Sequence, residues 1–213
     1  MNLFIGVLKP FRIALLLMTL PFAGCGAFSP RPDPSRFFTL SSLPQAEETV
    51  VKDSGNPERI FLGIGPIRFP GYLDRQEMVV RSAQNRFEVS ENDRWAEPLE
   101  ENFIRVLLQN LSALLPAERI VAYPWPNNGK PNYLVEIEVL RFETNAGREA
   151  QLWSRWAILD GSNKKPVNVK ASRLTRPAKE RSTDASVAAL SETVADLSRE
   201  IADAVRATDE RRK

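Results

Sequence analysis

Alternating apolar and polar positions predict that much of the chain forms β-sheet. The clearest run covers residues 133–143, where apolar side chains alternate with glutamates. Residues 151–159 and 167–171 repeat the alternation, and turn-forming residues separate the three runs. We therefore expect these runs to pair as an antiparallel meander. The apolar members of the last run, which share one face, are Val167, Val169 and Ala171.

Shorter apolar runs in the first half of the chain predict further strands. These are residues 37–43, 59–69 with a break at Gly65–Pro66, 77–81, 86–90 and 120–123. The third and fourth of these runs are separated by four turn-forming residues and should form a hairpin. The polar stretch 45–58 predicts a loop.

Residues 96–115 have apolar side chains at spacings of three and four, which is typical of an amphipathic helix. Pro98 suits its first turn, and Pro116 would end it. Acidic residues in the first turn interact favourably with the helix dipole. We expect the apolar stripe of this helix to pack in the core.

A second helix is expected over residues 183–206, where Thr183 or Asp184 can cap its first turn. Its apolar spacing predicts packing against the chain's own sheet, with a partner coiled coil as the alternative. A charged, frayed tail would follow at residues 208–213.

Together these elements predict an α+β fold. Residues 36–207 would form a single domain with a mainly antiparallel or mixed sheet of six to eight strands, covered on one face by the two long helices.

The first 24 residues have the three parts of an export signal. Lys9 and Arg12 form a basic region, residues 13–20 form a short apolar run, and Ala23–Gly24 are small residues before a cleavage point. The apolar run is shorter than the roughly 20 residues that a spanning helix needs. We expect a cleaved signal, with an uncleaved membrane anchor as the alternative.

Cys25, the single cysteine, directly follows the predicted cleavage point. The sequence Phe22-Ala23-Gly24-Cys25 resembles a bacterial lipobox, although Phe22 occupies the position where leucine is usual. The resemblance implies acylation of Cys25, and several acyl chains would anchor the protein stably; an unmodified cysteine is the alternative. The proline-rich residues that follow, within 25–35, predict an extended tether.

Composition excludes several classes of function. The chain has no histidine and one cysteine, so it cannot form a Ser-His-Asp triad, a Cys-His pair or a His/Cys metal site. Removing Lys9 and Arg12 with the signal lowers the 29 basic residues to 27, which equals the 27 acidic residues. This balance argues against nucleic-acid binding. No motif indicates a metal or a cofactor.

Two patterns invite a chemical interpretation. Asp93, Glu97, Glu100 and Glu101 could supply the paired carboxylates of a glycosidase, but the glutamates suit a helix start better. Trp153 and Trp156 are three residues apart and would point to opposite faces of a strand, so at least one should lie outside the core.

Several segments, in this order, resemble the ABC-type transport auxiliary lipoprotein family. They are residues 36–43 (RFFTLSSL), 64–75 (IGPIRFPGYLDR), 80–82 (VRS), 93–99 (DRWAEPL), 123–125 (YPW), 135–142 (VEIEVLRF) and a C-terminal helix with Ala189-Leu-Ser191. The stretch from Gly65 to Leu99 is the most specific part. One departure is Asn92, where the family pattern leads us to expect a histidine.

The resemblance implies a lipoprotein on the periplasmic face of the outer membrane of a Gram-negative bacterium. It would be an auxiliary subunit of an intermembrane lipid transport system that contains mammalian-cell-entry (MCE) domain proteins, and it would support membrane integrity. It would not be an enzyme; it would dock the periplasm-spanning MCE-domain partner at the outer membrane. A homo-oligomer would suit this role. The candidate partner-contact residues are Tyr72, Leu73, Asp74, Arg75, Arg94 and Trp95.

Two alternatives compete with the docking role. A direct periplasmic lipid carrier would need an apolar cavity lined by the tryptophans of the strands. A periplasmic envelope enzyme would need the carboxylates near residue 93 to act on a substrate.

Overall fold

The structure is a computed structural model that describes residues 33–44, 60–115, 117–125, 130–146 and 149–212. The chain divides into two compact units, residues 1–34 and 35–213, and the described residues belong almost entirely to the second. The predicted signal, Cys25, most of the predicted tether and the predicted loop at 45–58 lie outside the described residues.

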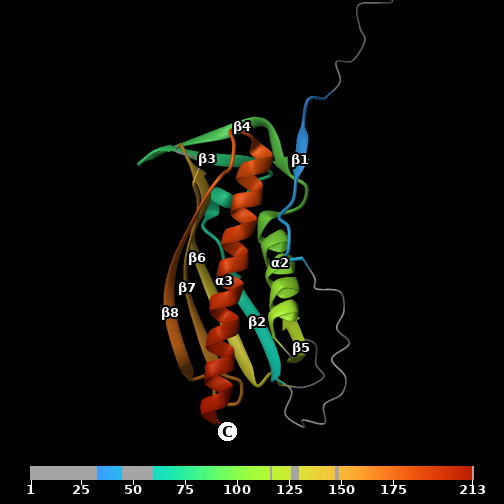
Figure 1. The fold of residues 1–213 in the computed structure, drawn as a ribbon, viewed down its shortest axis with the longest axis vertical. Coiled ribbons are helices and arrows are strands. Elements are labelled where there is room, and N and C mark those ends of the chain that lie inside the picture. The colour runs from blue at the N-terminus through green and yellow to red at the C-terminus, as the bar shows by residue number, and fades with distance from the viewer. Residues whose placement is uncertain (1–32, 45–59, 116, 126–129, 147–148, 213) are drawn as a thin grey trace, which may run out of the picture. The chain divides into compact units, whose positions relative to one another are not determined.

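Eight strands of the described part form one mixed sheet (Figure 1). The strands are β1 (Arg36–Phe38), β2 (Ile60–Arg68), β3 (Glu77–Ala83), β4 (Arg86–Trp95), β5 (Ala117–Ala122), β6 (Tyr133–Asn145), β7 (Glu149–Asp160) and β8 (Pro166–Pro177). Along one edge, β6 pairs antiparallel with β7, which pairs antiparallel with β8, so the predicted meander is confirmed. Along its other edge, β6 pairs in parallel with β2 and, near its end, with β3.

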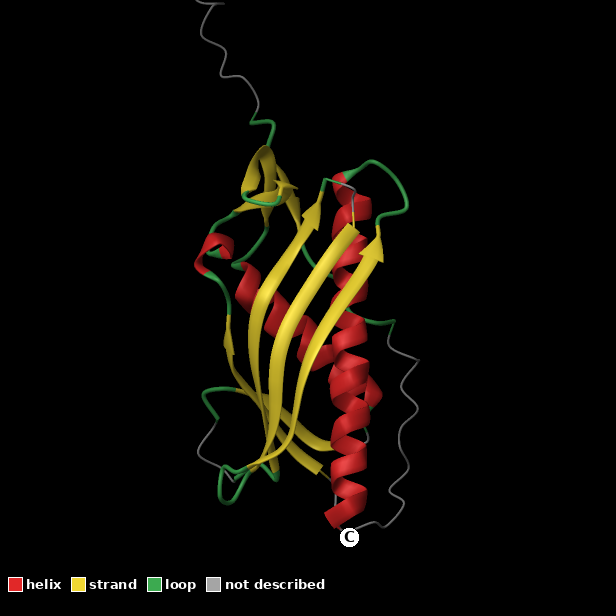
Figure 2. Ribbon diagram, turned by 90° about the vertical axis from the view of Figure 1, so that its left-hand side faces the viewer, coloured by secondary structure: helices red, strands yellow, loops and turns green. Residues whose placement is uncertain are grey.

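Two helices, α2 (Leu99–Leu114) and α3 (Thr183–Arg212), cover one face of the sheet (Figure 1). Helix α3 packs on β7 and β8, and α2 packs beside it over β5 and β2. The predicted α+β class and the two covering helices are confirmed. Figure 2 shows the other face of β6, β7 and β8 with no described helix in front of it.

The core lies between the two helices and the sheet. Phe103 of α2 is fully buried and makes edge-to-face contacts with Phe69 and with Phe142 of β6. Such ring pairs are worth about 0.5–1.5 kcal/mol beyond the area that they bury. The apolar stripe predicted for the first helix is therefore core rather than interface.

The segment before the predicted loop is held by side chains rather than by a sheet. Of the expected strand 37–43, only Phe37 and Phe38 pair; together with Arg36 they form β1, in parallel with β4. Farther on, the backbone N–H groups of Leu40 and Leu43 donate to the Oδ1 atoms of Asn102 and Asn110, each at 2.7 Å. Both asparagines belong to α2 and are fully buried, so the amides satisfy backbone groups that no strand pairs.

The boundary between β4 and the first helix differs from the prediction. Asp93, Arg94 and Trp95 continue the strand, and α2 begins at Leu99 instead of residue 96. Asp93 is tied to neighbouring elements, because it accepts hydrogen bonds from Arg36 (2.8 Å) and Thr183 (2.7 Å). Strand β4 thereby stays joined to β1 and to the start of α3.

Two other expectations need correction. The strand predicted to break at Gly65–Pro66 is continuous, and the irregularity is a register shift in its pairing with β6. Helix α3 is capped by Ser182, whose Oγ accepts from the N–H of Ala185 at 3.1 Å, rather than by Thr183 or Asp184.

The predicted frayed tail is helical as far as residue 212. Its side chains contact the sheet, which explains the extension. Thr208 is buried, and the guanidinium of Arg212 lies over the ring of Tyr133, 5.7 Å from its centre. The Tyr133 hydroxyl is the main cause that raises the pKa of Arg212 above its usual value.

Candidate functional site

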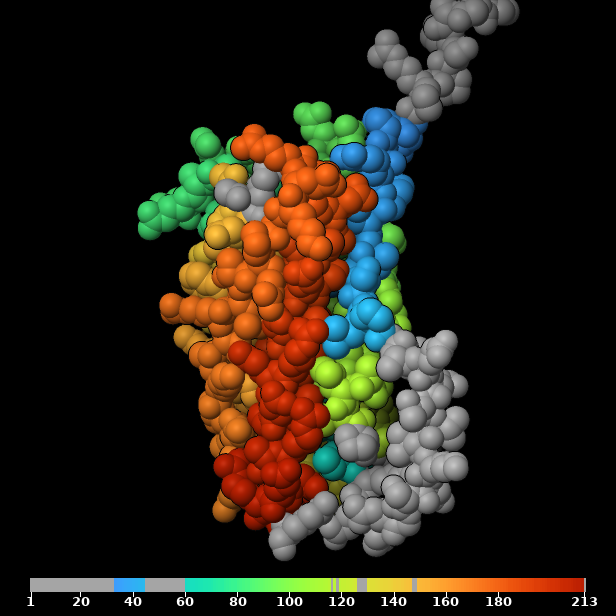
Figure 3. Space-filling view, in the orientation of Figure 1, coloured from blue at the N-terminus to red at the C-terminus, as the bar shows by residue number. Residues whose placement is uncertain are grey.

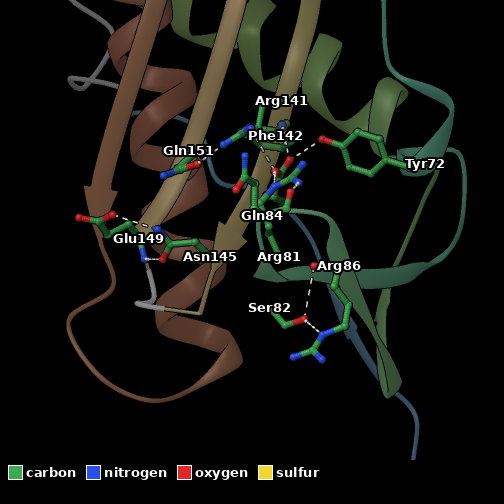
Figure 4. Close-up of polar contacts among 11 residues, drawn as sticks. Tyr72, Arg81, Ser82, Gln84, Arg86, Arg141, Phe142, Asn145, Glu149 and Gln151 are labelled. Atoms are coloured by element: carbon green, nitrogen blue, oxygen red, sulfur yellow. Dashed lines mark hydrogen bonds and ion pairs between the residues drawn. The ribbon is translucent and has the colours of Figure 1, made fainter.

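A buried carboxylate organises the region around Tyr72, one of the predicted contact residues; Figure 4 shows Tyr72 and Arg81 among the polar side chains there. Glu143 lies near the end of β6 and is 2% exposed. Its neighbour Phe142 points into the core against α2, so Glu143 points to the opposite face of the sheet. There it accepts a hydrogen bond from the Nε of Arg81 at 2.7 Å and another from the hydroxyl of Tyr72.

These bonds join three separate elements. Tyr72 belongs to the short 3₁₀ turn η1 (Gly71–Leu73), Arg81 to β3 and Glu143 to β6. A second arginine, Arg141, lies with its Nε 3.5 Å from the same carboxylate. A buried carboxylate with this many charged and polar partners is strongly destabilised when one partner is removed.

An aromatic stack covers the buried carboxylate. The rings of Tyr72 and Phe87 are stacked with their centres 4.6 Å apart, and the guanidinium of Arg81 lies 4.2 Å from the centre of the Phe87 ring. Burial, and then the hydrogen bond to Glu143, raise the pKa of Tyr72 above its usual value. Tyr72 therefore stays protonated and donates to Glu143 over the whole neutral range.

Next to η1, a cleft of about 560 Å³ opens between this turn and the start of α2. Its apolar lining is Phe69, Leu73, Leu99 and Ile104, and its polar lining is Asp74, Arg75, Gln76, Glu100 and Glu101. The helix begins at the cleft with Pro98 in the N-cap position, which provides no side-chain cap. The cleft thus combines an apolar surface with charged, exposed side chains, as docking sites for protein segments do.

The structure places the six predicted contact residues in three different environments. Asp74 and Arg75 are exposed at the cleft, where a partner can reach them. Tyr72 is half-buried and bonded to Glu143. Leu73 and Trp95 are 4% and 5% exposed and belong to the core. Both side chains therefore pack inside the domain, and of the two only Leu73 also borders the cleft.

Arg94, the sixth residue, is half-buried on β4. Its Nε is buried and has no hydrogen-bond partner among the described residues. It stays a candidate contact, since a partner that supplied an acceptor could satisfy it.

The four carboxylates of the glycosidase interpretation lie in different surroundings. Asp93 joins β4 to β1 and α3, as described above. Glu97 accepts hydrogen bonds from Arg105 and Asn102, and the bond from Arg105 is the main cause that lowers its pKa. Glu100 and Glu101 are exposed in the first turn of α2. The described residues contain no cluster of acidic or sulfur ligands suited to a metal ion.

The tryptophans of β7 occupy opposite faces, as predicted. Trp156 is buried beneath α3 and donates to the Oγ of Ser172 at 2.9 Å, whereas Trp153 is half-buried on the uncovered face. They therefore do not line one common cavity, which is the feature that the lipid-carrier alternative requires.

Sequence reasoning missed Glu143 and Arg81. Strict alternation would place Glu143 on the same face as the apolar Val135, Ile137 and Val139. The register shift between Val139 and Arg141 moves it to the opposite face, and no sequence pattern indicates that shift. The signal was indirect: Tyr72 and Arg81 lie in segments 64–75 and 80–82, which carry the family resemblance, whereas Glu143 lies just beyond segment 135–142.

The comparisons with known proteins agree with the fold and with that resemblance. A family model described as "ABC-type transport auxiliary lipoprotein component" matches residues 38–202. The crystal structure of an uncharacterized protein aligns with a TM-score of 0.65 at 18% identity, covering 80% of this chain and 98% of the other. A Xanthomonas campestris protein of the DUF330 family aligns with a TM-score of 0.65 at 16% identity, covering 83% and 98%.

At these identities the structural likeness shows the fold alone. No curated protein matches the chain in sequence. Within the described part, no helix has the length and apolar character needed to cross a membrane.

We predict that Tyr72→Phe changes the alkaline stability of the domain. The folded-state pKa of Tyr72 is raised above its ordinary value of 10.0, so its contribution to the free energy of unfolding is complete below pH 10 and is lost as the pH rises above it. Urea denaturation of the wild type from pH 8 to 11 should show this loss, and Tyr72→Phe should lose less over the same interval.

Tyr123→Phe is the matched control, since Tyr123 is largely exposed. Identical pH dependence in the wild type and Tyr72→Phe would show that Tyr72 is not held protonated by its surroundings.

Proposed function

The chain belongs to the ABC-type transport auxiliary lipoprotein components, and from that membership we propose that it docks the periplasm-spanning MCE-domain partner of a lipid transport system at the outer membrane. In this role the domain supplies a binding surface, and acyl chains on Cys25 supply the membrane anchor. By holding the partner in place, the protein supports membrane integrity. The family is one of transport auxiliary lipoproteins and not an enzyme family.

The observation that carries the proposal is the cleft between η1 and α2. It lies within the part of the sequence that most specifically resembles the family, and it displays Asp74 and Arg75 on its rim. The bond between Tyr72 and Glu143 holds the adjacent turn in place, so the rim charges are presented by a fixed backbone. Interfaces gain affinity when the contacting groups are already ordered in the free protein.

The proposed membrane anchor is inferred from the sequence around Cys25. Cys25 directly follows the predicted signal, and at most nine residues separate it from Ser35, where the domain unit begins. A chain extends at most about 3.6 Å per residue, so the ten steps from Cys25 to Ser35 span at most about 36 Å. The domain can therefore act close to the membrane surface without inserting into it.

We expect Cys25→Ala to remove the anchor and leave the docking surface intact. Labelled palmitate should enter the wild-type protein but not the variant, and the variant should move from the outer-membrane fraction to the soluble periplasm. Both proteins should still co-purify with the MCE-domain protein. Palmitate in the variant, or an unlabelled wild type, would contradict the proposed anchor.

We expect the double charge reversal Asp74→Lys with Arg75→Glu to weaken docking. Rim charges that face a partner become repulsive on reversal, and co-purification of the MCE-domain protein should fall roughly tenfold. Lys179→Glu, at an exposed position away from the cleft, is the control and should bind as the wild type does. Equal recovery with the double variant would show that the cleft is not the docking site.

A further inference from the structure

Strand β8 has an inverted polarity. Val167 and Val169 are 44% and 71% exposed, whereas Ser172 is buried on the side of the strand that faces α3. Lys170, on that same side, forms an ion pair with Glu200 of α3 at 3.0 Å. A strand with one covered face normally turns its apolar residues toward the cover. Here Glu200 of α3 interacts with Ser172 and Lys170 on the covered side. Leu174 on that side still packs against the core, whereas Val167 and Val169 lie on the uncovered face.

The apolar side chains of β8 continue into a shallow hollow on this face. In the sheet register Val169 is opposite Ala157 of β7, which is opposite Glu136 of β6. A hollow of about 150 Å³ lies here, large enough for one partner side chain. The residues that line it on this face are Arg68, Glu136, Glu138, Arg155, Ala157 and Val169. We call these residues, together with the adjacent Arg141, Trp153 and Arg173, the outer-face patch.

Beside the hollow, two arginines flank a tryptophan. Arg141 of β6 and Arg173 of β8 are the register neighbours of Trp153, and their guanidinium carbons lie 3.9 Å and 5.0 Å from the centre of a Trp153 ring. Cation–π contacts of this kind hold long side chains in place before a partner arrives. Tryptophan and arginine are also the residues most enriched among those that dominate binding energy at protein interfaces.

The charge of the outer-face patch is positive, since it contains four arginines and two glutamates. Arg155 lies 3.8 Å from Glu138, but neither Arg68 nor Arg173 forms an ion pair with a described residue. A second copy of this patch would bring like net charges together. An anionic lipid surface would meet Glu136 and Glu138 at the rim of the hollow. A protein segment can instead place one apolar side chain in the hollow and carboxylates against the free arginines.

We propose that the outer-face patch binds an acidic segment of a partner protein, with an apolar side chain in the hollow and Asp or Glu residues on Arg68 and Arg173. The inference rests on the proposed docking function and adds a second contact surface, on a face of the domain distinct from the cleft. It identifies the partner segment by its chemistry, an apolar residue flanked by acidic residues.

The test is site-specific photo-cross-linking in cells that contain the whole transport system. The photoreactive residue p-benzoyl-phenylalanine replaces Val169 in the full-length protein, and a control places it at Glu192, an exposed position on α3. Adducts are identified by mass spectrometry. We expect the Val169 position, but not the Glu192 position, to capture a subunit of the transport system through a segment in which Asp or Glu flanks an apolar residue.

Charge reversal then tests the arginines. Combining the Val169 probe with Arg173→Glu should lower the adduct about fivefold, whereas Arg199→Glu on α3 should leave it unchanged. Circular dichroism of each purified variant checks that it is folded. An adduct that withstands Arg173→Glu in a folded protein would overturn the proposed role of this arginine and with it the inference.

The remaining outcomes separate this inference from the proposed function. Adducts at Val169 with lipid, with a second copy of the chain, with a segment that lacks acidic residues, or with nothing would each overturn the inference. In those cases the MCE-domain protein would still co-purify through the cleft if the docking function is correct. Loss of co-purification with the wild-type protein would overturn both.

Discussion

The carboxylate of Glu143 is the interaction on which the candidate docking region depends. It is a charge placed on the sheet face away from the helices, yet it is buried because η1 and the β3–β4 hairpin fold over it. Strand pairing holds that hairpin to the rest of the sheet only weakly, since β3 pairs with β6 through two register positions, while Met78 and Trp95 add contacts with the core. The bonds from Tyr72 and Arg81 therefore fix the turn that borders the cleft. A buried ion network of this kind specifies one arrangement more than it adds stability, and we offer that as its role here.

The two faces of the sheet have different functions. Phe103, Phe142 and their neighbours between the sheet and the two helices hold the domain together. The other face, turned toward the viewer in Figure 2, combines the buried Glu143 network with an exposed patch around Trp153 and Val169. In the space-filling view, the helix layer that Figure 1 shows in front forms a closely packed surface (Figure 3). The cleft, which the start of α2 also lines, and the outer-face patch therefore lie on different parts of the domain.

Much of the fold could be predicted from the sequence because periodicity records which face is buried. The strand at 133–143 and the apolar stripes of both helices were predicted correctly. Where the prediction failed, a tertiary contact outweighed a local signal. Pro98 indicated a helix start near residue 96. Strand β4 instead continues to Trp95, because Arg36 and Thr183 bind Asp93, and the helix begins only at Leu99. Alternation in the last strand correctly predicted that Val167 and Val169 share a face. It did not predict that this face is exposed, because that depends on Glu200 of α3, which binds the polar residues on the other face.

The site was less predictable for the same reason. The family resemblance indicated the region around residues 72–75, and Asp74 and Arg75 are indeed exposed there. It could not indicate that Leu73 and Trp95 lie in the core, nor that Glu143, about 70 residues later, completes the site. Contacts between residues so distant in sequence have no local signature in a single chain.

The measurement that tests this account most directly is amide hydrogen exchange on Glu143→Gln, which keeps the side-chain shape but removes the charge. If Glu143 holds η1 and the hairpin in place, protection should fall within residues 71–83 while β7 and β8 exchange as in the wild type. Unchanged protection over residues 71–83 would contradict the account, because the turn and the cleft would then be ordered without the buried carboxylate.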